Sequence, residues 1–103
     1  MQQFENVTVK LKANQYFDGN VTSRTITFQD GSVKTLGIMM PGEYTFGTSQ
    51  HEVMEILAGD VDVRLPNSSE WLKYTENTVF EVPANTSFDV RVHKVTDYCC
   101  SYS

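Results

Sequence analysis

The 103-residue chain lacks the segments that would place it in a membrane or on a nucleic acid. No apolar run approaches the ~18 residues needed to cross a bilayer, and the start, MQQFENVTVKLKAN, has no apolar signal-peptide core. Thirteen acidic against eight basic residues give a net charge of −5, whereas proteins that bind a nucleic-acid backbone present a basic face. We therefore expect a cytoplasmic protein without a membrane or nucleic-acid partner.

Cysteine is also scarce, because Cys99 and Cys100 are the two present and they are adjacent. Neighbours on a strand point to opposite faces, so a disulfide between them is poorly placed. No histidine cluster accompanies them to form a zinc site. We expect reduced thiols, with Cys100 facing inward as a small apolar side chain.

Helical periodicity is missing, and short alternating segments take its place. Turn dipeptides separate these segments at Asp18-Gly19, Asp30-Gly31, Pro41-Gly42 and Gly59-Asp60. The expected strands are 7–11, 21–28, 33–40, 53–57, 61–65, 71–74, 79–82, 88–92 and 98–102. So many short strands in ~100 residues predict one all-β domain, either a sandwich or a small barrel.

One segment, GEYTFGTSQHEVMEILAG (42–59), has the spacing of a metal-binding motif. The motif resembles G-x5-H-x-H-x3-E-x6-G, the first motif of the cupins, which are small jelly-roll β-barrels. Aligned on Gly59, it places the glutamate at Glu52. The two histidine positions fall on Phe46 and Thr48.

The second cupin motif resembles G-x5-P-x-G-x2-H-x3-N, and NTVFEVPANTSFDVRV (77–92) fits its frame. Pro83 is retained, but Phe88 stands at the histidine position. Only Glu52 remains of four expected ligands, and a lone carboxylate beside phenyl rings cannot hold a transition metal. His51 is one residue out of phase and His93 lies near a strand end, so we expect both on the surface and no bound metal.

The positions expected to face inward form an aromatic cavity with a few polar groups, which is typical of a small-molecule pocket. They are Tyr44, Phe46, Thr48, Glu52, Met54, Phe88, Tyr98 and Tyr102. Spacing alone leaves a filled core as the alternative, since phenylalanines inside barrels usually only pack. Glu52 favours the pocket, because a buried carboxylate is costly unless it is paired or functional, and burial should raise its pKa.

The chain also shows a narrower resemblance, carried by segments in a fixed order and spacing. They are NQYFDGNVTS (14–23), TLGIMMPGEYTFGT (35–48), EVMEILAG (52–59), Trp71, FEVPANTSF (80–88) and YCCSY (98–102). Together they resemble the pyrimidine/purine nucleoside phosphorylase family of small cytoplasmic bacterial cupins. The resemblance covers 14–102 and makes 1–103 a single cupin domain. Residues 1–13 are left as an N-terminal extension in which we expect an extra strand.

The resemblance implies phosphorolysis of purine and pyrimidine nucleosides to free base and pentose 1-phosphate. Inorganic phosphate would be a co-substrate, and no metal or other cofactor would be needed. Stacking on aromatic rings stabilises a bound base by about 1–3 kcal/mol, largely regardless of which base it is. Phe46, Phe88 and Tyr98 are therefore candidates to hold the base of a broad-specificity enzyme.

Glu52 is the candidate to contact the ribose hydroxyls or to donate a proton to the leaving base. No glycine-rich phosphate cradle is present, and the arginines are Arg24, Arg64 and Arg91. Arg91 alternates against Phe88 and should face outward. We favour Arg24 for phosphate, with Thr48 as a hydroxyl donor.

Two questions stay open at this point. A non-catalytic cupin that binds a nucleoside-like ligand is the alternative to the enzyme, and the missing histidines disfavour a metal-dependent isomerase or dioxygenase. A homodimer is expected from the family resemblance, since the strand around Val7, Val9 and Leu11 could pair across an interface.

Overall fold

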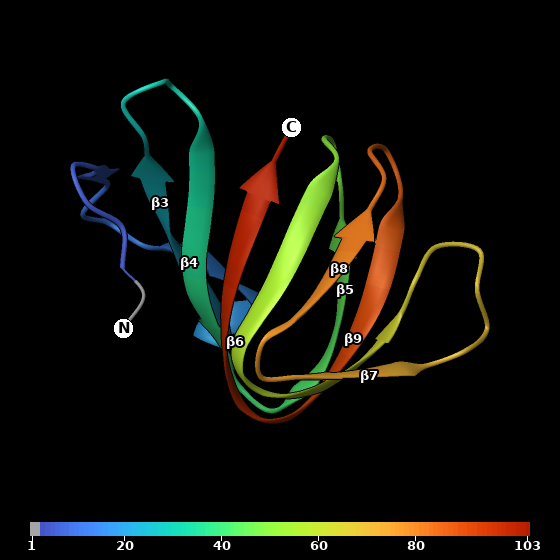
Figure 1. The fold of residues 1–103 in the computed structure, drawn as a ribbon. Coiled ribbons are helices and arrows are strands. Elements are labelled where there is room, and N and C mark those ends of the chain that lie inside the picture. The colour runs from blue at the N-terminus through green and yellow to red at the C-terminus, as the bar shows by residue number, and fades with distance from the viewer. Residues whose placement is uncertain (1–2) are drawn as a thin grey trace.

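The computed structural model describes residues 3–103, and these residues confirm an all-β chain (Figure 1). No helix among them is long and apolar enough to cross a membrane. The elements in order are β1 (Thr8–Val9), β2 (Asn14–Tyr16), the 3-10 helix η1 (Phe17–Gly19), β3 (Val21–Thr27), β4 (Val33–Met39), β5 (Gly42–Gly47), β6 (Glu52–Arg64), β7 (Leu72–Thr75), β8 (Thr78–Val82) and β9 (Ser87–Tyr102).

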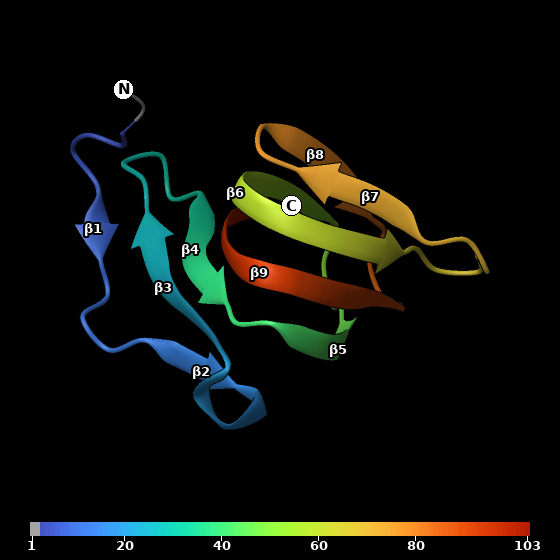
Figure 2. The same cartoon turned by 90° about the horizontal axis from the view of Figure 1, so that it is seen from below.

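All these strands belong to one antiparallel sheet in the order β1-β3-β4-β9-β6-β7, with β2 on β3, β5 on β9 and β8 on β6. The long strands β6 and β9 curve together around the base of the molecule, so the sheet folds over into a roll (Figures 1 and 2). Among residues 3–103 the pairings do not join into a ring. The predicted jelly roll is therefore present in an open form.

The tight turn predicted at Gly59-Asp60 is wrong, because 52–64 form one continuous strand. The two strands predicted at 88–92 and 98–102 are likewise one strand, β9. The pairing of β6 with β9 shifts register between residues 56 and 61, which lets both strands bend without separating. Gly59 lies at this bend with φ +142°, and a Cβ there would collide with Thr96. Glycine supplies the bend that the sequence pattern suggested was a turn.

The turns at Asp18-Gly19 and Asp30-Gly31 are confirmed, since they connect antiparallel neighbours β2–β3 and β3–β4. The strand expected over 7–11 is shorter than predicted. It covers Thr8–Val9, and the Leu11 side chain beyond it is 89% exposed.

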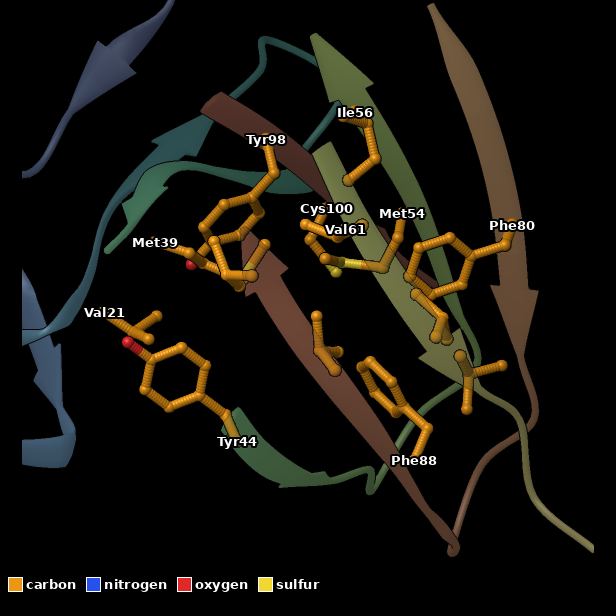
Figure 3. Packing of buried hydrophobic residues seen from close by; sticks show 14 residues of the cluster. Val21, Met39, Tyr44, Met54, Ile56, Val61, Phe80, Phe88, Tyr98 and Cys100 are labelled. Atoms are coloured by element: carbon orange, nitrogen blue, oxygen red, sulfur yellow. The ribbon is translucent and has the colours of Figure 1, made fainter. Parts of the chain in front are cut away.

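The hydrophobic core lies inside the roll and takes alternate side chains from the strands (Figure 3). On β6, Ile56, Val61 and Val63 are fully buried, and each such side chain stabilises the fold by about 1.5–3 kcal/mol. Cys99 and Cys100 are both buried free thiols. Cys100 belongs to the core cluster, which confirms its inward orientation.

Candidate functional site

A cavity of about 120 Å³ lies inside the roll beside the core. Its walls come from β2, β3, β4, β5, β6 and β9, so the curling of the whole sheet creates it. The residues that line it are Tyr16, Ser23, Met39, Phe46, Gly47, Glu52, Met54, Phe88, Tyr98, Cys100 and Tyr102.

Glu52 supplies the carboxylate of this cavity. It pairs with Tyr102 across β6 and β9, while Met54 pairs with Cys100, so Glu52 and Cys100 are diagonal neighbours on the inner face. The Cys100 thiol donates a hydrogen bond to Glu52 Oε1 at 3.4 Å. Burial raises the pKa of Glu52, and the thiol hydrogen bond opposes this rise. The site therefore holds a carboxyl group that keeps its proton to a higher pH than an exposed one.

One end of the cavity is lined by hydroxyl groups. Tyr98 Oη donates to the Thr22 carbonyl oxygen at 3.4 Å, and Asn14 Nδ2 donates to Ser23 Oγ at 3.3 Å. Burial raises the pKa of Tyr98, so its hydroxyl remains a hydrogen-bond donor. Gly37 on β4 makes room for this ring, because a Cβ there would lie 2.7 Å from the ring carbon Cζ.

Another part of the lining is aromatic. Phe46 on β5 and Phe88 on β9 are paired in register, and their rings stack at 5.5 Å with an interplanar angle of 29°. Phe17 of η1 meets the edge of Phe46 at 5.5 Å and packs on Tyr44 at 4.9 Å. Phe17 has φ +53°, an uncommon conformation for a bulky side chain. The η1 turn thus packs an aromatic ring against the wall residue Phe46, while Phe17 itself does not line the cavity.

The structure brings six of the predicted site residues together at the cavity, namely Phe46, Glu52, Met54, Phe88, Tyr98 and Tyr102. Phe46 and Phe88 occupy histidine positions of the cupin motifs, and they line the same space as Glu52. Figure 3 shows Met54, Phe88 and Tyr98 pointing into the roll. The Tyr102 hydroxyl lies 3.0 Å from Thr35 Oγ1, and burial raises the pKa of Tyr102.

Three predicted site residues do not line the cavity. Tyr44 is buried behind Phe46, and its hydroxyl donates to the Met40 carbonyl oxygen at 2.6 Å. Thr48 Oγ1 donates to the Pro83 carbonyl oxygen at 2.8 Å and so joins two loops. Arg24 is exposed, and its Nε donates to the Leu11 carbonyl oxygen at 3.3 Å. The functions assigned to these three stay predictions.

The sequence interpretation missed five lining residues. Ser23 shares the inner face of β3 with buried Val21, and this alternation was a usable signal. Cys100 was predicted to face inward, but as a packing residue and not as part of the site. No local pattern in the sequence marked the other three, because they reach the cavity through strand pairing or lack polar side-chain chemistry. All five are Tyr16, Ser23, Met39, Gly47 and Cys100.

A known protein family matches most of the chain that forms this fold and cavity. The model of the family described as pyrimidine/purine nucleoside phosphorylase matches residues 11–102. The chain belongs to the pyrimidine/purine nucleoside phosphorylase family. The resemblance inferred from the sequence segments is thereby confirmed.

Curated members of the family match over nearly their whole length. A pyrimidine/purine nucleoside phosphorylase of Sulfurovum sp. (strain NBC37-1) is 61% identical over 102 residues, which are 99% of both chains. One from Clostridioides difficile (strain 630) is 56% identical over 99% of this chain and 97% of its own.

Solved structures support the fold. A protein of unknown function from Acinetobacter sp. ADP1 is 39% identical with a TM-score of 0.96, covering 98% of each chain. An RmlC-like cupin from Shewanella frigidimarina NCIMB 400 is 16% identical with a TM-score of 0.73, covering 100% of this chain and 94% of its own. The roll of this family member is therefore a cupin fold.

The donor set of the cavity does not fit a transition-metal ion. Glu52 faces aromatic side chains there, and burial raises the pKa of Cys100, which keeps the thiol protonated. Within residues 3–103, one group that could hold a metal, Asp60, Asp62 and His93, has ligand atoms within 4.8 Å of one another. Asp60 and Asp62 alternate with inward Val61 and Val63, so this group lies on the outer face.

The charged residues of the outer face neutralise one another. Arg64 Nη2 lies 2.7 Å from Asp89 Oδ2, and Arg91 Nε lies 2.9 Å from Glu43 Oε1. The two guanidinium groups approach the Trp71 ring at 4.9 and 3.8 Å. Arg91 therefore faces outward as predicted. No arginine or lysine occurs among the cavity-lining residues of the described chain.

The histidines His51 and His93 are surface residues, as predicted. Their side chains are 39% and 46% exposed. His51 Nε2 lies 3.1 Å from Glu81 Oε1, and His93 Nε2 lies 2.8 Å from Asp62 Oδ2.

Proposed function

We propose that this chain is a broad-specificity nucleoside phosphorylase, which converts purine and pyrimidine nucleosides and inorganic phosphate to free base and pentose 1-phosphate. The observation that carries the proposal is the cavity in which the carboxyl group of Glu52 lies with the stacked rings of Phe46 and Phe88. Relatives that match 99% of this chain carry the same activity in their names.

The aromatic wall suits the base. Rings such as those of Phe46 and Phe88 contact the π-face that every base has, so they contribute similar stacking energy for purines and pyrimidines. Tyr98 and Met54 line the same space and exclude water from the base and sugar. Specificity is broad because stacking does not read the hydrogen-bonding edge of the base.

Glu52 acts as the general acid in this scheme. A phosphate oxygen forms the new bond to C1′ with a lone pair while the C1′–N bond breaks, and the electron pair of that bond moves to the base nitrogen. Glu52 donates a proton to the departing base and regains one from the hydrogenphosphate now esterified at C1′. The pKa of Glu52, raised by burial, keeps that proton available nearer to neutral pH.

Phosphate binds at the hydroxyl-lined end. Tyr16 and Ser23 supply neutral hydroxyl donors there, and a protonated Glu52 removes a charge that would repel the anion. Arg24 stays our sequence-based alternative. Ser23→Ala and Arg24→Ala separate the two, because the KM for phosphate should rise severalfold for the variant that loses a phosphate contact.

The decisive test measures release of free base from uridine and adenosine with and without phosphate. We expect both nucleosides to be cleaved only with phosphate, and pentose 1-phosphate to accumulate in equal amount. Equal rates without phosphate would make the protein a hydrolase. Saturable binding of either nucleoside without any turnover would support the non-catalytic binding protein instead.

We further propose that the enzyme is independent of metal, acts in the cytoplasm and forms a homodimer. The exposed Val9 and Leu11 beside the outer edge of β1 support a dimer contact at that edge. Sedimentation of the wild type and of a Val9→Lys, Leu11→Lys double variant tests this, and a monomeric wild type would refute it.

A further inference from the structure

Cys100 contacts the proposed general acid directly. Its Sγ lies 3.4 Å from Glu52 Oε1, and its second hydrogen bond, to the Ser101 carbonyl oxygen, is longer at 3.9 Å. Cys100 is 2% exposed. Its strand neighbour Cys99 is equally buried, at 3%, but points to the other face of the sheet. The thiol of Cys100 is thus fixed in place on the inner face.

The two oxygens of Glu52 differ in their surroundings. Among residues 3–103, Cys100 is the side chain that hydrogen-bonds Oε1, and no protein group hydrogen-bonds Oε2. Every fully buried side-chain nitrogen or oxygen of these residues has a partner. Oε2 therefore retains surface that is accessible from the cavity.

We propose that Cys100 is a positioning residue, whose thiol holds Oε1 of Glu52 so that Oε2 faces the nucleoside. This inference rests on the proposed function of Glu52. A thiol suits the task because it is a weak donor. It orients the carboxyl group while stabilising the ionised form less than a hydroxyl or a cation would, so the pKa of Glu52 remains raised.

The other groups facing Glu52 do not perform this task. Tyr98 and Tyr102 from β9 and Tyr16 from β2 line the same cavity, and Val82 pairs with Glu52 from β8. Burial raises the pKa of Tyr98 and Tyr102, so they stay neutral near pH 7. The thiol is therefore the group whose replacement should alter Glu52 most selectively.

Two substitutions change the donor in opposite directions. Cys100→Ala removes it, and Cys100→Ser replaces it with a stronger one. Cys99→Ala is the matched control, since it empties a similar buried volume on the same strand away from Glu52. Titration of the Glu52 carboxyl carbon by NMR reports on the contact, and the pH profile of kcat/KM reports on its use.

We expect the Glu52 midpoint to rise in Cys100→Ala and to fall in Cys100→Ser, each by about half a pH unit, because a donor favours the ionised carboxylate. The alkaline limb of kcat/KM should move with it. At low pH, kcat should fall about fivefold in Cys100→Ala and recover to within about twofold of wild type in Cys100→Ser. Cys99→Ala should lower the Tm but leave the midpoint and the limb unchanged.

An unchanged Glu52 midpoint in both Cys100 variants would overturn the inference, even if Glu52→Gln is inactive and the proposed function stands. A shifted midpoint together with full activity of Glu52→Gln would show a contact without a catalytic role. That result would refute the function of Glu52 and with it the positioning role.

Discussion

The two ends of β6 carry carboxylates in opposite settings. Glu52, at the start of the strand, faces the cavity, and the side chain that hydrogen-bonds it among residues 3–103 is a neutral thiol. Asp62, near the end, lies on the outer face between His93 at 2.8 Å and the Lys73 ammonium at 3.5 Å. The same strand thus holds one carboxylate away from basic side chains and places another between a histidine and a lysine.

The pKa values respond in opposite directions. Burial raises the pKa of Glu52, whereas the hydrogen bond from His93 and then the charge of Lys73 lower the pKa of Asp62. A group with a raised pKa can deliver a proton near neutral pH, while one with a lowered pKa stays ionised and forms ion pairs. This difference supports the proposed role of Glu52 as the general acid and is consistent with a structural role for Asp62.

Replacing each carboxyl group by its amide should give the largest contrast in activity. Glu52→Gln keeps the shape but cannot donate the proton, so kcat/KM should fall at least tenfold, about 1.4 kcal/mol or more of transition-state stabilisation. Asp62→Asn should stay within about twofold of wild type. Initial rates with uridine and adenosine test both. Wild-type rates in a folded Glu52→Gln protein would remove Glu52 from the mechanism.

Substitutions in the aromatic wall next to Glu52 should lower kcat/KM less than loss of the carboxyl group does. They should lower it equally for nucleosides of all bases. Phe88→Leu loses stacking of about 1–3 kcal/mol, so kcat/KM should fall about fivefold or more for purine and pyrimidine nucleosides alike. Phe80→Leu is the control, because Phe80 is a buried ring that does not line the cavity. A loss confined to one base class would contradict broad stacking.

The folding stability contributed by the carboxyl groups at the two ends of β6 should also depend on pH in opposite ways. The pKa of Glu52 is higher in the folded protein than in the unfolded chain. The stabilisation that Glu52 gives to the folded protein is therefore fully present below about pH 4.3. It is lost as the pH rises through the pKa of Glu52 in the folded state. Glu52→Gln escapes this loss, so its Tm relative to wild type should be higher at pH 8 than at pH 4. Equal differences at both pH values would argue against a raised pKa.

Asp62 should show the reverse dependence with a smaller amplitude. Its lowered pKa gives stability that is present above about pH 3.9 and is lost as the pH falls through the folded pKa. Solvent screens this outer-face pair, so Asp62→Asn should cost at most about 1 kcal/mol at pH 7. Urea unfolding at pH 7 and pH 3 measures this, and the cost should shrink at the lower pH.

Chelation should have the smallest effect of all. The proposed mechanism uses no metal at either end of β6. On the outer face, Lys73 Nζ already lies 2.7 Å from Asp60 Oδ1. The cavity at the other end offers no suitable donor set. EDTA should leave kcat/KM unchanged, and elemental analysis should find well under one equivalent of zinc, iron, manganese or nickel. One equivalent of metal lost together with activity would overturn this prediction.

Motif spacing was sufficient to predict part of the site. Phe46, Glu52 and Phe88 could be placed together because they sit at fixed alternate positions of strands whose inner face the cupin pattern defines. Thr48 shows where this reasoning ends. β5 stops at Gly47, so alternation no longer governs the next residue, and Thr48 turns to the loop carbonyl of Pro83.

Other features depend on contacts between distant strands. Tyr16 reaches the cavity because β2 pairs with β3 and η1 turns through left-handed backbone conformations, which no local periodicity reveals. The bend at Gly59 was read as a chain reversal because glycine followed by aspartate is common in turns. Whether a glycine bends or reverses a strand is decided by the partner strand, here β9.

That shared bend has a consequence for how the molecule opens and forms. Because β6 and β9 stay paired on both sides of Gly59, two continuous strands carry one ladder through both halves of the roll. Amide protons of both halves should therefore exchange with solvent in one cooperative unit at the rate of global unfolding. The partners on β6 and β9 also lie far apart in the chain, and such distant pairing makes folding slow, in milliseconds to seconds, compared with helical proteins of this size.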